Sequence, residues 1–172
     1  SGCVTSAETI LLESQSVEEL LGRVSADPTL QVVFTVSSAS RRALAAHFEI
    51  LPSDLSSWLY QELFPLIRKN LRAVLDISLA EAIVLAESVQ ERSDRRDRLP
   101  ILTSHCPGWT CYASKLLGQG ILDRFSIVKS AEQIQGLIVK RLVPTFGARH
   151  NNILHILISP CFDKKLEIIR YD

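Results

Sequence analysis

The sequence predicts an α/β domain in which a parallel sheet carries helices on both faces. Two observations lead to this fold class. Strand-like runs that are apolar on both faces alternate with segments of helical periodicity, as a parallel sheet covered on both sides requires. The chain has 172 residues, of which 47% are hydrophobic and 22% charged, so it is long enough to bury a substantial core.

Four strands are expected. Each is short, apolar and rich in branched aliphatic residues, which is typical of a strand buried within a sheet. They cover residues 31–36, 71–77, 99–103 and 153–158, and residues 125–128 fit a further short strand.

Helices are expected between the strands, because apolar residues recur there every three or four positions. Ser16 and Glu19 have the spacing of a capping box that starts one helix. Ser130 caps another, with Glu132 in its first turn. Pro65 is expected to kink or break the helix that contains it. The expected helices are two short segments within 3–25, then 41–48, 51–65, 79–92, 108–117 and 130–142.

Composition argues against several functions. The formal net charge is zero at pH 7, so there is no global electrostatic reason to expect nucleic acid or an anionic membrane as partner. No apolar run reaches the roughly 18–20 residues needed to span a bilayer. The charged run over residues 91–98 mixes acids with arginines, and we interpret it as a solvated helix end and loop rather than a nucleic-acid patch.

The start of the chain bears on its organisation. Ser1-Gly2-Cys3 is neither an initiator methionine nor a charged signal sequence, and the chain contains no methionine. We therefore expect a piece of a longer protein. Residues 1–28 are interpreted as a helical lead-in from a cluster-binding segment that precedes them, and residues 29–172 as the α/β lobe.

Two of the four cysteines follow expected strands. Cys106 and Cys161 each neighbour a proline at the carboxyl end of a strand, the edge at which parallel sheets bind ligands. Four scattered cysteines do not suggest a disulfide-stapled domain, which favours a reduced, intracellular setting. Thiolates suit iron–sulfur clusters and zinc, but neither residue has the close cysteine neighbour of a structural zinc site. A shared metal site and simple burial of apolar cysteines both stay open at this point, and Cys111 is expected to serve packing.

Both turns resemble motifs of the iron-only hydrogenase family. Residues 103–109 (Thr-Ser-His-Cys-Pro-Gly-Trp) resemble the family's Thr-Ser-Cys-Cys-Pro-x-Trp. Residues 160–167 (Pro-Cys-Phe-Asp-Lys-Lys-Leu-Glu) resemble its Pro-Cys-x-x-Lys-x-x-Glu. Residues 129–133 and 37–48 are also similar to the family. The resemblance implies one lobe of the iron-only hydrogenase-like fold, with the second lobe outside this chain.

The resemblance also implies roles for single residues. Cys106 and Cys161 match two of the four ligands of a [4Fe–4S] cluster, whose other two ligands lie in a later Cys-x-x-x-Cys motif. Lys164 matches a lysine that contacts the diiron subsite of true hydrogenases. Independently of the resemblance, Glu167 is close enough to Lys164 in the sequence for the two to pair. Cys3 matches the last ligand of a Cys-x-x-Cys-x-x-Cys run that serves an N-terminal [4Fe–4S] cluster. We therefore expect two clusters in the full-length protein and only partial ligand sets in this chain.

Position 105 departs from the hydrogenase pattern. True hydrogenases carry a cysteine there that shuttles protons to the diiron centre, whereas this chain has His105. We therefore expect no hydrogenase activity. With the pattern Cys-Pro-Gly-Trp-x-Cys-Tyr over residues 106–112, the departure favours the eukaryotic non-hydrogenase branch. That branch comprises the cytosolic iron–sulfur assembly factors, also called nuclear prelamin A recognition factor-like proteins.

The branch implies a cluster-binding component of cytosolic iron–sulfur protein assembly. Its expected partners are early scaffold proteins and the late targeting complex, which it would link, with no nucleic acid and no membrane. The expected location is the cytoplasm, and the nucleus in addition. Two alternatives stay open: a hydrogenase-type redox enzyme, which His105 argues against, and a prelamin-binding interaction module. The second predicts that replacing Cys106 and Cys161 leaves function intact.

Overall fold

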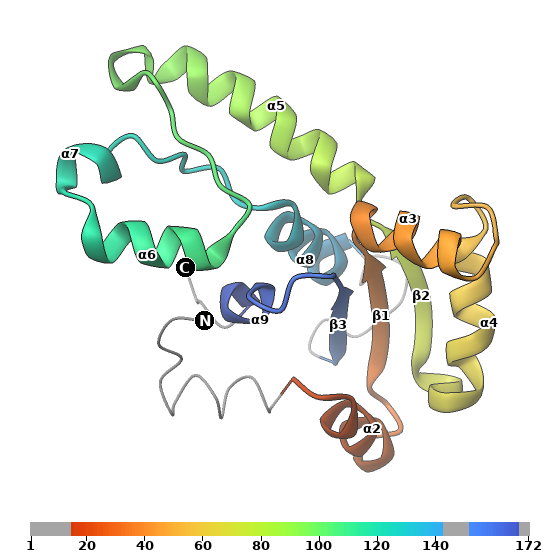
Figure 1. Cartoon of the computed structure of the whole chain (residues 1–172). Helices are drawn as coiled ribbons and strands as arrows, with labels where there is room; N and C mark the ends of the chain where they lie inside the picture. The colour runs from red at the N-terminus through yellow and green to blue at the C-terminus, as the bar shows by residue number, and fades with distance from the viewer. Residues whose placement is uncertain (1–14, 143–151, 169–172) are drawn as a thin grey trace.

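Three parallel strands form the centre of the fold in a computed structural model that describes residues 15–142 and 152–168 (Figure 1). The strand order is β2-β1-β3, so that β1 (Gln31–Val36) lies between β2 (Leu71–Asp76) and β3 (Ile153–Ile158). β1 and β3 pair residue by residue along their whole length. The predicted α/β class, with a parallel sheet, is confirmed.

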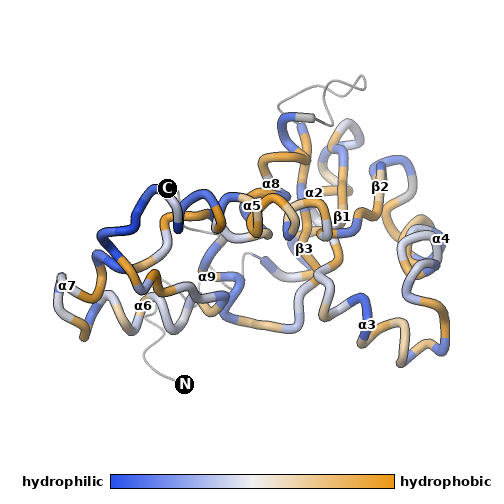
Figure 2. The backbone as a smooth tube through the Cα atoms, turned by 90° about the horizontal axis from the view of Figure 1, so that it is seen from above, coloured by the Kyte–Doolittle hydropathy of each residue, from blue (hydrophilic) through white to orange (hydrophobic). Residues whose placement is uncertain are grey.

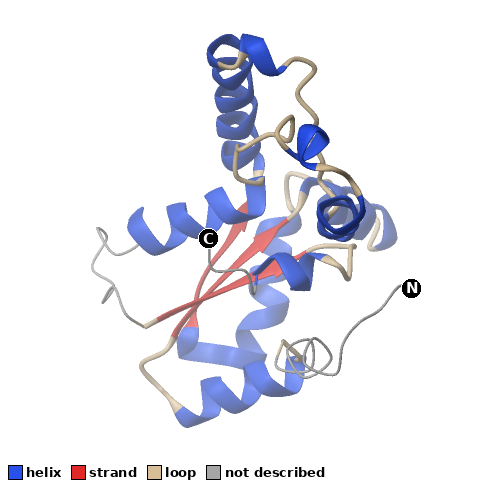
Figure 3. Ribbon diagram, turned by 90° about the vertical axis from the view of Figure 1, so that its left-hand side faces the viewer, coloured by secondary structure: helices blue, strands red, loops and turns tan. Residues whose placement is uncertain are grey.

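Helices cover both faces of this sheet (Figure 3). α2 and α4 pack on one face, and α5 and α8 on the other. α6 and α7 lie to one side of the sheet and α3 and α4 to the opposite side (Figure 2). None of the helices in the described ranges combines the length and apolar character needed to cross a membrane. The helices are α2 (Val17–Ala26), α3 (Ser38–His47), α4 (Leu55–Ile67), α5 (Ser78–Asp94), α6 (Pro107–Leu116), α7 (Gln119–Leu122), α8 (Ala131–Leu142) and α9 (Lys164–Ile168).

The core explains why β1 is apolar on both faces. Val32 and Phe34 pack in a cluster that includes side chains of α2 and α4, and both are at most 5% exposed. Val33 is fully buried as well. On the face toward α8, Gln135 of that helix donates to Thr35 at 3.4 Å. Since each fully buried aliphatic side chain contributes roughly 1.5–3 kcal/mol, β1 is a main source of the stability of this sheet.

The expected third strand, over residues 99–103, does not join the sheet. Leu102 forms an isolated parallel bridge with Phe125, and this bridge also takes the place of the short strand expected over 125–128. Pro100 has no N–H to offer a ladder. The sheet in the described part of the chain therefore has three strands and not four.

Two helix predictions had different outcomes. Ser16 caps α2, because its hydroxyl accepts the Glu19 N–H at 3.2 Å, as predicted. The predicted break at Pro65 is wrong: α4 continues through this residue to Ile67. Pro65 lies in the last turn, so it removes one backbone hydrogen bond near an end that frays in any case. The first of the two helical segments expected within residues 3–25 lies outside the described residues.

The charged run over residues 91–98 is not simply a solvated helix end. Glu91 is only 6% exposed. Its carboxylate accepts the Ser126 hydroxyl at 2.5 Å and the Ile127 N–H at 2.9 Å, and it pairs with Arg95 at 2.5 Å. Arg95 also donates to the carbonyl of Phe125 at 2.9 Å. These bonds hold the segment before α8 against the end of α5.

Candidate metal centre

Cys106 lies at the start of α6 and acts as its N-cap. Its sulfur accepts the backbone N–H of Trp109 at 3.3 Å. Pro107 takes the first helical position, where its missing N–H costs nothing. The side chain of Cys106 is exposed. The sequence therefore presents a thiol at a helix N-terminus to an outside ligand.

Cys161 lies in the turn between β3 and α9. Its side chain is exposed. Its N–H points to the hydroxyl of Ser159 at 3.5 Å, and its carbonyl accepts the N–H of Lys164 at 3.2 Å. The turn is therefore shaped by local hydrogen bonds and leaves the sulfur outward.

The two cysteine turns meet although they are far apart in sequence. Figure 1 shows α9 beside α6, and the two helices are in contact. A Cβ atom added to Gly108 would lie 2.9 Å from Oδ2 of Asp163 and 3.6 Å from the sulfur of Cys106. The absence of a side chain at Gly108 thus lets the turn after Cys161 approach the helix that begins at Cys106.

Lys164, the first residue of α9, is buried beside this contact with only 7% of its surface exposed. Its ammonium lies 2.8 Å from Glu167 of the same helix and 3.1 Å from Glu132 of α8. Burial alone would lower the pKa of Lys164, but the hydrogen bond to Glu167 and the charge of Glu132 outweigh it and raise the pKa above its usual value. The predicted pairing of Lys164 with Glu167 is confirmed, whereas the role of Glu132 was missed. Acidic residues are common in the first turn of a helix because they interact favourably with the helix dipole. Nothing in the local sequence shows whether such a residue also forms a buried ion pair.

The donor set fits part of a cluster site. Cys106 and Cys161 offer two exposed sulfurs, and thiolates are the ordinary ligands of iron–sulfur clusters. Within the described ranges, no group of three or more histidine, cysteine and acidic side chains could hold a metal ion. Cys111 is partly exposed further along α6, and Cys3 lies outside the described residues. The two turns thus present half of the usual four ligands.

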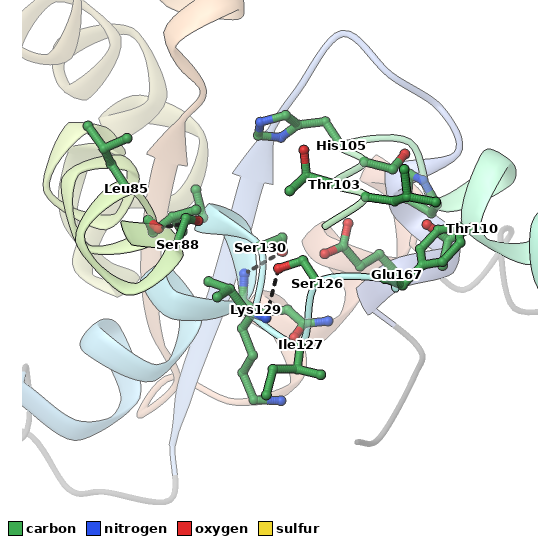
Figure 4. Close-up of a pocket in the computed structure, with 18 of the residues that line it drawn as sticks. Leu85, Ser88, Thr103, His105, Thr110, Ser126, Ile127, Lys129, Ser130 and Glu167 are labelled. Carbon is green, nitrogen blue, oxygen red and sulfur yellow. Dashed lines mark hydrogen bonds between the residues drawn. The ribbon is translucent and has the colours of Figure 1, made fainter. Parts of the chain in front are cut away.

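A cavity of about 860 Å³ adjoins the start of α6 (Figure 4). His105 lies exposed on its wall, together with Thr103 of the same loop and Thr110 of α6. Ser126 contributes a further hydroxyl, and Glu167 reaches the wall from α9. The cavity therefore lies between the position that departs from the hydrogenase motif and the ion cluster around Lys164. No local pattern in the sequence indicates this cavity, because its walls come from four separate stretches of the chain: 81–88, 102–110, 125–133 and Glu167.

The structure defines a parallel α/β domain in which two turns beyond the strands, each with an exposed cysteine, contact one another. Comparison with known proteins identifies its family. Residues 30–172 match the family described as iron only hydrogenase large subunit, C-terminal domain. The chain belongs to this family.

Individual relatives indicate one branch of this family. Over its whole length the chain is 40% identical to Protein NAR1 of Arabidopsis thaliana. It is 38% identical to cytosolic iron-sulfur assembly component 3 of Pongo abelii and to the cytosolic Fe-S cluster assembly factor narfl of Danio rerio. The chain spans 38% of the first two proteins and 44% of the third. The predicted family and its iron–sulfur assembly branch are thereby confirmed.

Proposed function

We propose that this chain belongs to a component of cytosolic iron–sulfur protein assembly and supplies two ligands, Cys106 and Cys161, to a [4Fe–4S] cluster. The observation that carries the proposal is the contact of the two cysteine turns at Gly108 and Asp163, with both thiols exposed. The printed names of the relatives support the assembly role.

The remaining ligands come from outside the described residues. A later Cys-x-x-x-Cys motif supplies the other two ligands of this cluster, and Cys3 ends the ligand run of a second, N-terminal [4Fe–4S] cluster. In this account residues 1–28 lead from that first cluster site into the lobe formed by residues 29–172. The protein acts in the cytoplasm, and also in the nucleus, where it links early scaffold proteins to the late targeting complex.

When bound, the cluster would supply one-electron redox chemistry or would itself be transferred to other proteins. The residues of this chain would hold it. The Trp109 N–H that bonds the sulfur of Cys106 stabilises charge at the cluster edge. Lys164 belongs to the proposed site because it follows Cys161 by three residues and is buried beside the contact of the two cysteine turns.

The proposed function is not that of a hydrogenase. His105 stands where hydrogenases carry the proton-shuttling thiol. In addition, the ammonium of Lys164 is already paired with Glu132 and Glu167. This ammonium is therefore neutralised within the protein and is not free to contact a diiron subsite, as the matching lysine of hydrogenases does.

A maturation assay tests the proposed function. Cells depleted of the endogenous protein receive the full-length protein, either wild type or with Cys161→Ala, and the activity of cytosolic iron–sulfur enzymes is measured. We expect the wild type to restore these activities and the variant to fail. Full restoration by the variant would contradict the proposal and favour an interaction module. Hydrogen evolution by the reconstituted wild type would favour the redox enzyme instead.

A further inference from the structure

The turn that carries Cys161 has little burial of its own. Pro160, Cys161, Phe162 and Asp163 are all exposed. The first buried side chain after β3 is that of Lys164. Lys164 is therefore the first buried anchor of the turn that carries Cys161, and its N–H donates to the Cys161 carbonyl at 3.2 Å.

The two carboxylate partners of Lys164 differ in one structural respect. Glu167 lies on α9 itself, so its bond at 2.8 Å stays within one short helix. Glu132 lies in the first turn of α8, which packs against β3 and α5. Its neighbour Ala131 is 3% exposed and belongs to a core cluster with Ile77, the residue between β2 and α5. The contact with Glu132 therefore joins α9 to a helix of the packed core, whereas the contact with Glu167 stays within α9.

A second contact holds the same turn from the other side. Asp163 packs over Gly108 at the start of α6. Asp163 and Lys164 are consecutive, so the turn is held between the helix of Cys106 and the start of α8. The separation of the two sulfurs therefore depends on both contacts.

Resting on the proposed function, we propose that Glu132 is a positioning residue for the cluster ligand Cys161 and acts through Lys164. The ion pair between α8 and α9 sets the distance and direction of the Cys161 sulfur relative to Cys106. A cluster requires its ligands at fixed separations, so sulfurs held in place before it arrives lose less conformational freedom on binding.

Two variants separate positioning from charge compensation. Glu132→Ala and Glu167→Ala remove the same charge from the same ammonium, but only Glu132→Ala removes an ion pair between α8 and α9. The readout is the rate at which dibromobimane, a short reagent that joins two thiols, links Cys106 to Cys161 in the chain without any metal. Mass spectrometry of the digested product identifies the linked pair.

We expect Glu132→Ala to lose most of the cross-link while each thiol still reacts with a single-site reagent at the wild-type rate. Glu167→Ala should retain most of the cross-link. Equal losses in both variants would overturn the proposal in favour of a charge effect, and no loss in Glu132→Ala would overturn it outright.

Two controls keep the test decisive. Lys140→Met changes an exposed lysine in the last turn of α8, at the opposite end of that helix from Glu132, so it should leave the cross-link unchanged. If Glu132→Ala does not fold, Glu132→Gln keeps the shape of the side chain, and faster amide hydrogen exchange in α9 is then the expected result. Unchanged exchange there would contradict the proposal. Because no cluster is present in these measurements, failure of the cluster assignment would not alter their outcome.

Discussion

The carboxylate of Asp163 occupies the space beside Gly108 that a side chain at this position would need. Oδ2 would lie 2.9 Å from a Cβ atom there. This contact links the turns of Cys106 and Cys161, and each of these cysteines neighbours a proline. Glycine at position 108 therefore has a structural reason independent of any family pattern.

Adding that Cβ is the direct test of the contact. We expect Gly108→Ala to displace Asp163 and slow the cross-linking of Cys106 to Cys161. The free energy of unfolding should change by no more than about 1 kcal/mol, because Asp163 is exposed and alanine is the better helix former. The measurement is the dibromobimane reaction together with urea unfolding. The double variant Gly108→Ala/Asp163→Ala should recover part of the cross-linking rate, and a double variant no faster than the single one would argue against the contact.

The buried Glu91 should be a main stabilising residue of the region between α5 and α8. Removing it leaves Arg95 and the Ile127 N–H without their carboxylate, so Glu91→Ala should cost about 3 kcal/mol in the free energy of unfolding. Urea denaturation measures this cost. Glu87→Ala, which changes an exposed acid of the same helix, should cost less than about 0.5 kcal/mol. Similar costs for the two variants would show that the Glu91 contacts do not stabilise the fold.

Glu91 also predicts a dependence on pH. Burial raises its pKa, but the hydrogen bonds from Ser126 and Ile127 and the pairing with Arg95 outweigh this and lower the pKa below its usual value. Its contribution to stability is then present above the ordinary glutamate pKa and is lost as the pH falls through the lower pKa of the folded state. Unfolding free energies measured at a series of acidic pH values should therefore fall less steeply in Glu91→Gln than in the wild type. Parallel curves would contradict this.

The buried His155 of β3 should also make stability depend on pH, in a higher pH range than Glu91. Burial, with a smaller effect of the charge on Lys140, lowers the pKa of His155 to about 4. At pH values between the ordinary histidine pKa and the lower pKa of the folded state, His155 binds a proton in the unfolded chain but not in the folded chain. The free energy of unfolding therefore falls as the pH decreases through this range. The loss should be at most on the order of 3 kcal/mol. Removing the ring in His155→Gln should flatten the curve in this range, whereas His47→Gln, at an exposed position, should not.

Much of the fold was predictable because it follows from local patterns. β1, β2 and β3 were expected within one residue of their observed bounds, since short apolar runs between turn residues leave little choice. Residues 99–103 have a similar apolar pattern but do not join the sheet. Pro100 weakens the run, and its position against Phe125 depends on contacts with distant parts of the chain.

Only part of the candidate site was predictable from the sequence. The cysteines were identified because their chemistry and neighbouring prolines are visible in the sequence. Glu132 and Glu91 were not identified, because an acid on a helix is usually solvated and only the tertiary structure shows what buries it. Their partners Lys164 and Ser126 lie more than 30 residues away in the sequence.

The central claim is that Cys106 and Cys161 bind the same [4Fe–4S] cluster. Mössbauer spectroscopy of the iron-enriched full-length protein, with iron and acid-labile sulfide analysis, tests it most directly. Two clusters are expected in the wild type. Cys106→Ser and Cys161→Ser should both lose the signal of one cluster, and it should be the same cluster in the two variants. Cys111→Ser should keep the signals of both clusters. Wild-type spectra and iron content in Cys106→Ser and Cys161→Ser would contradict the account.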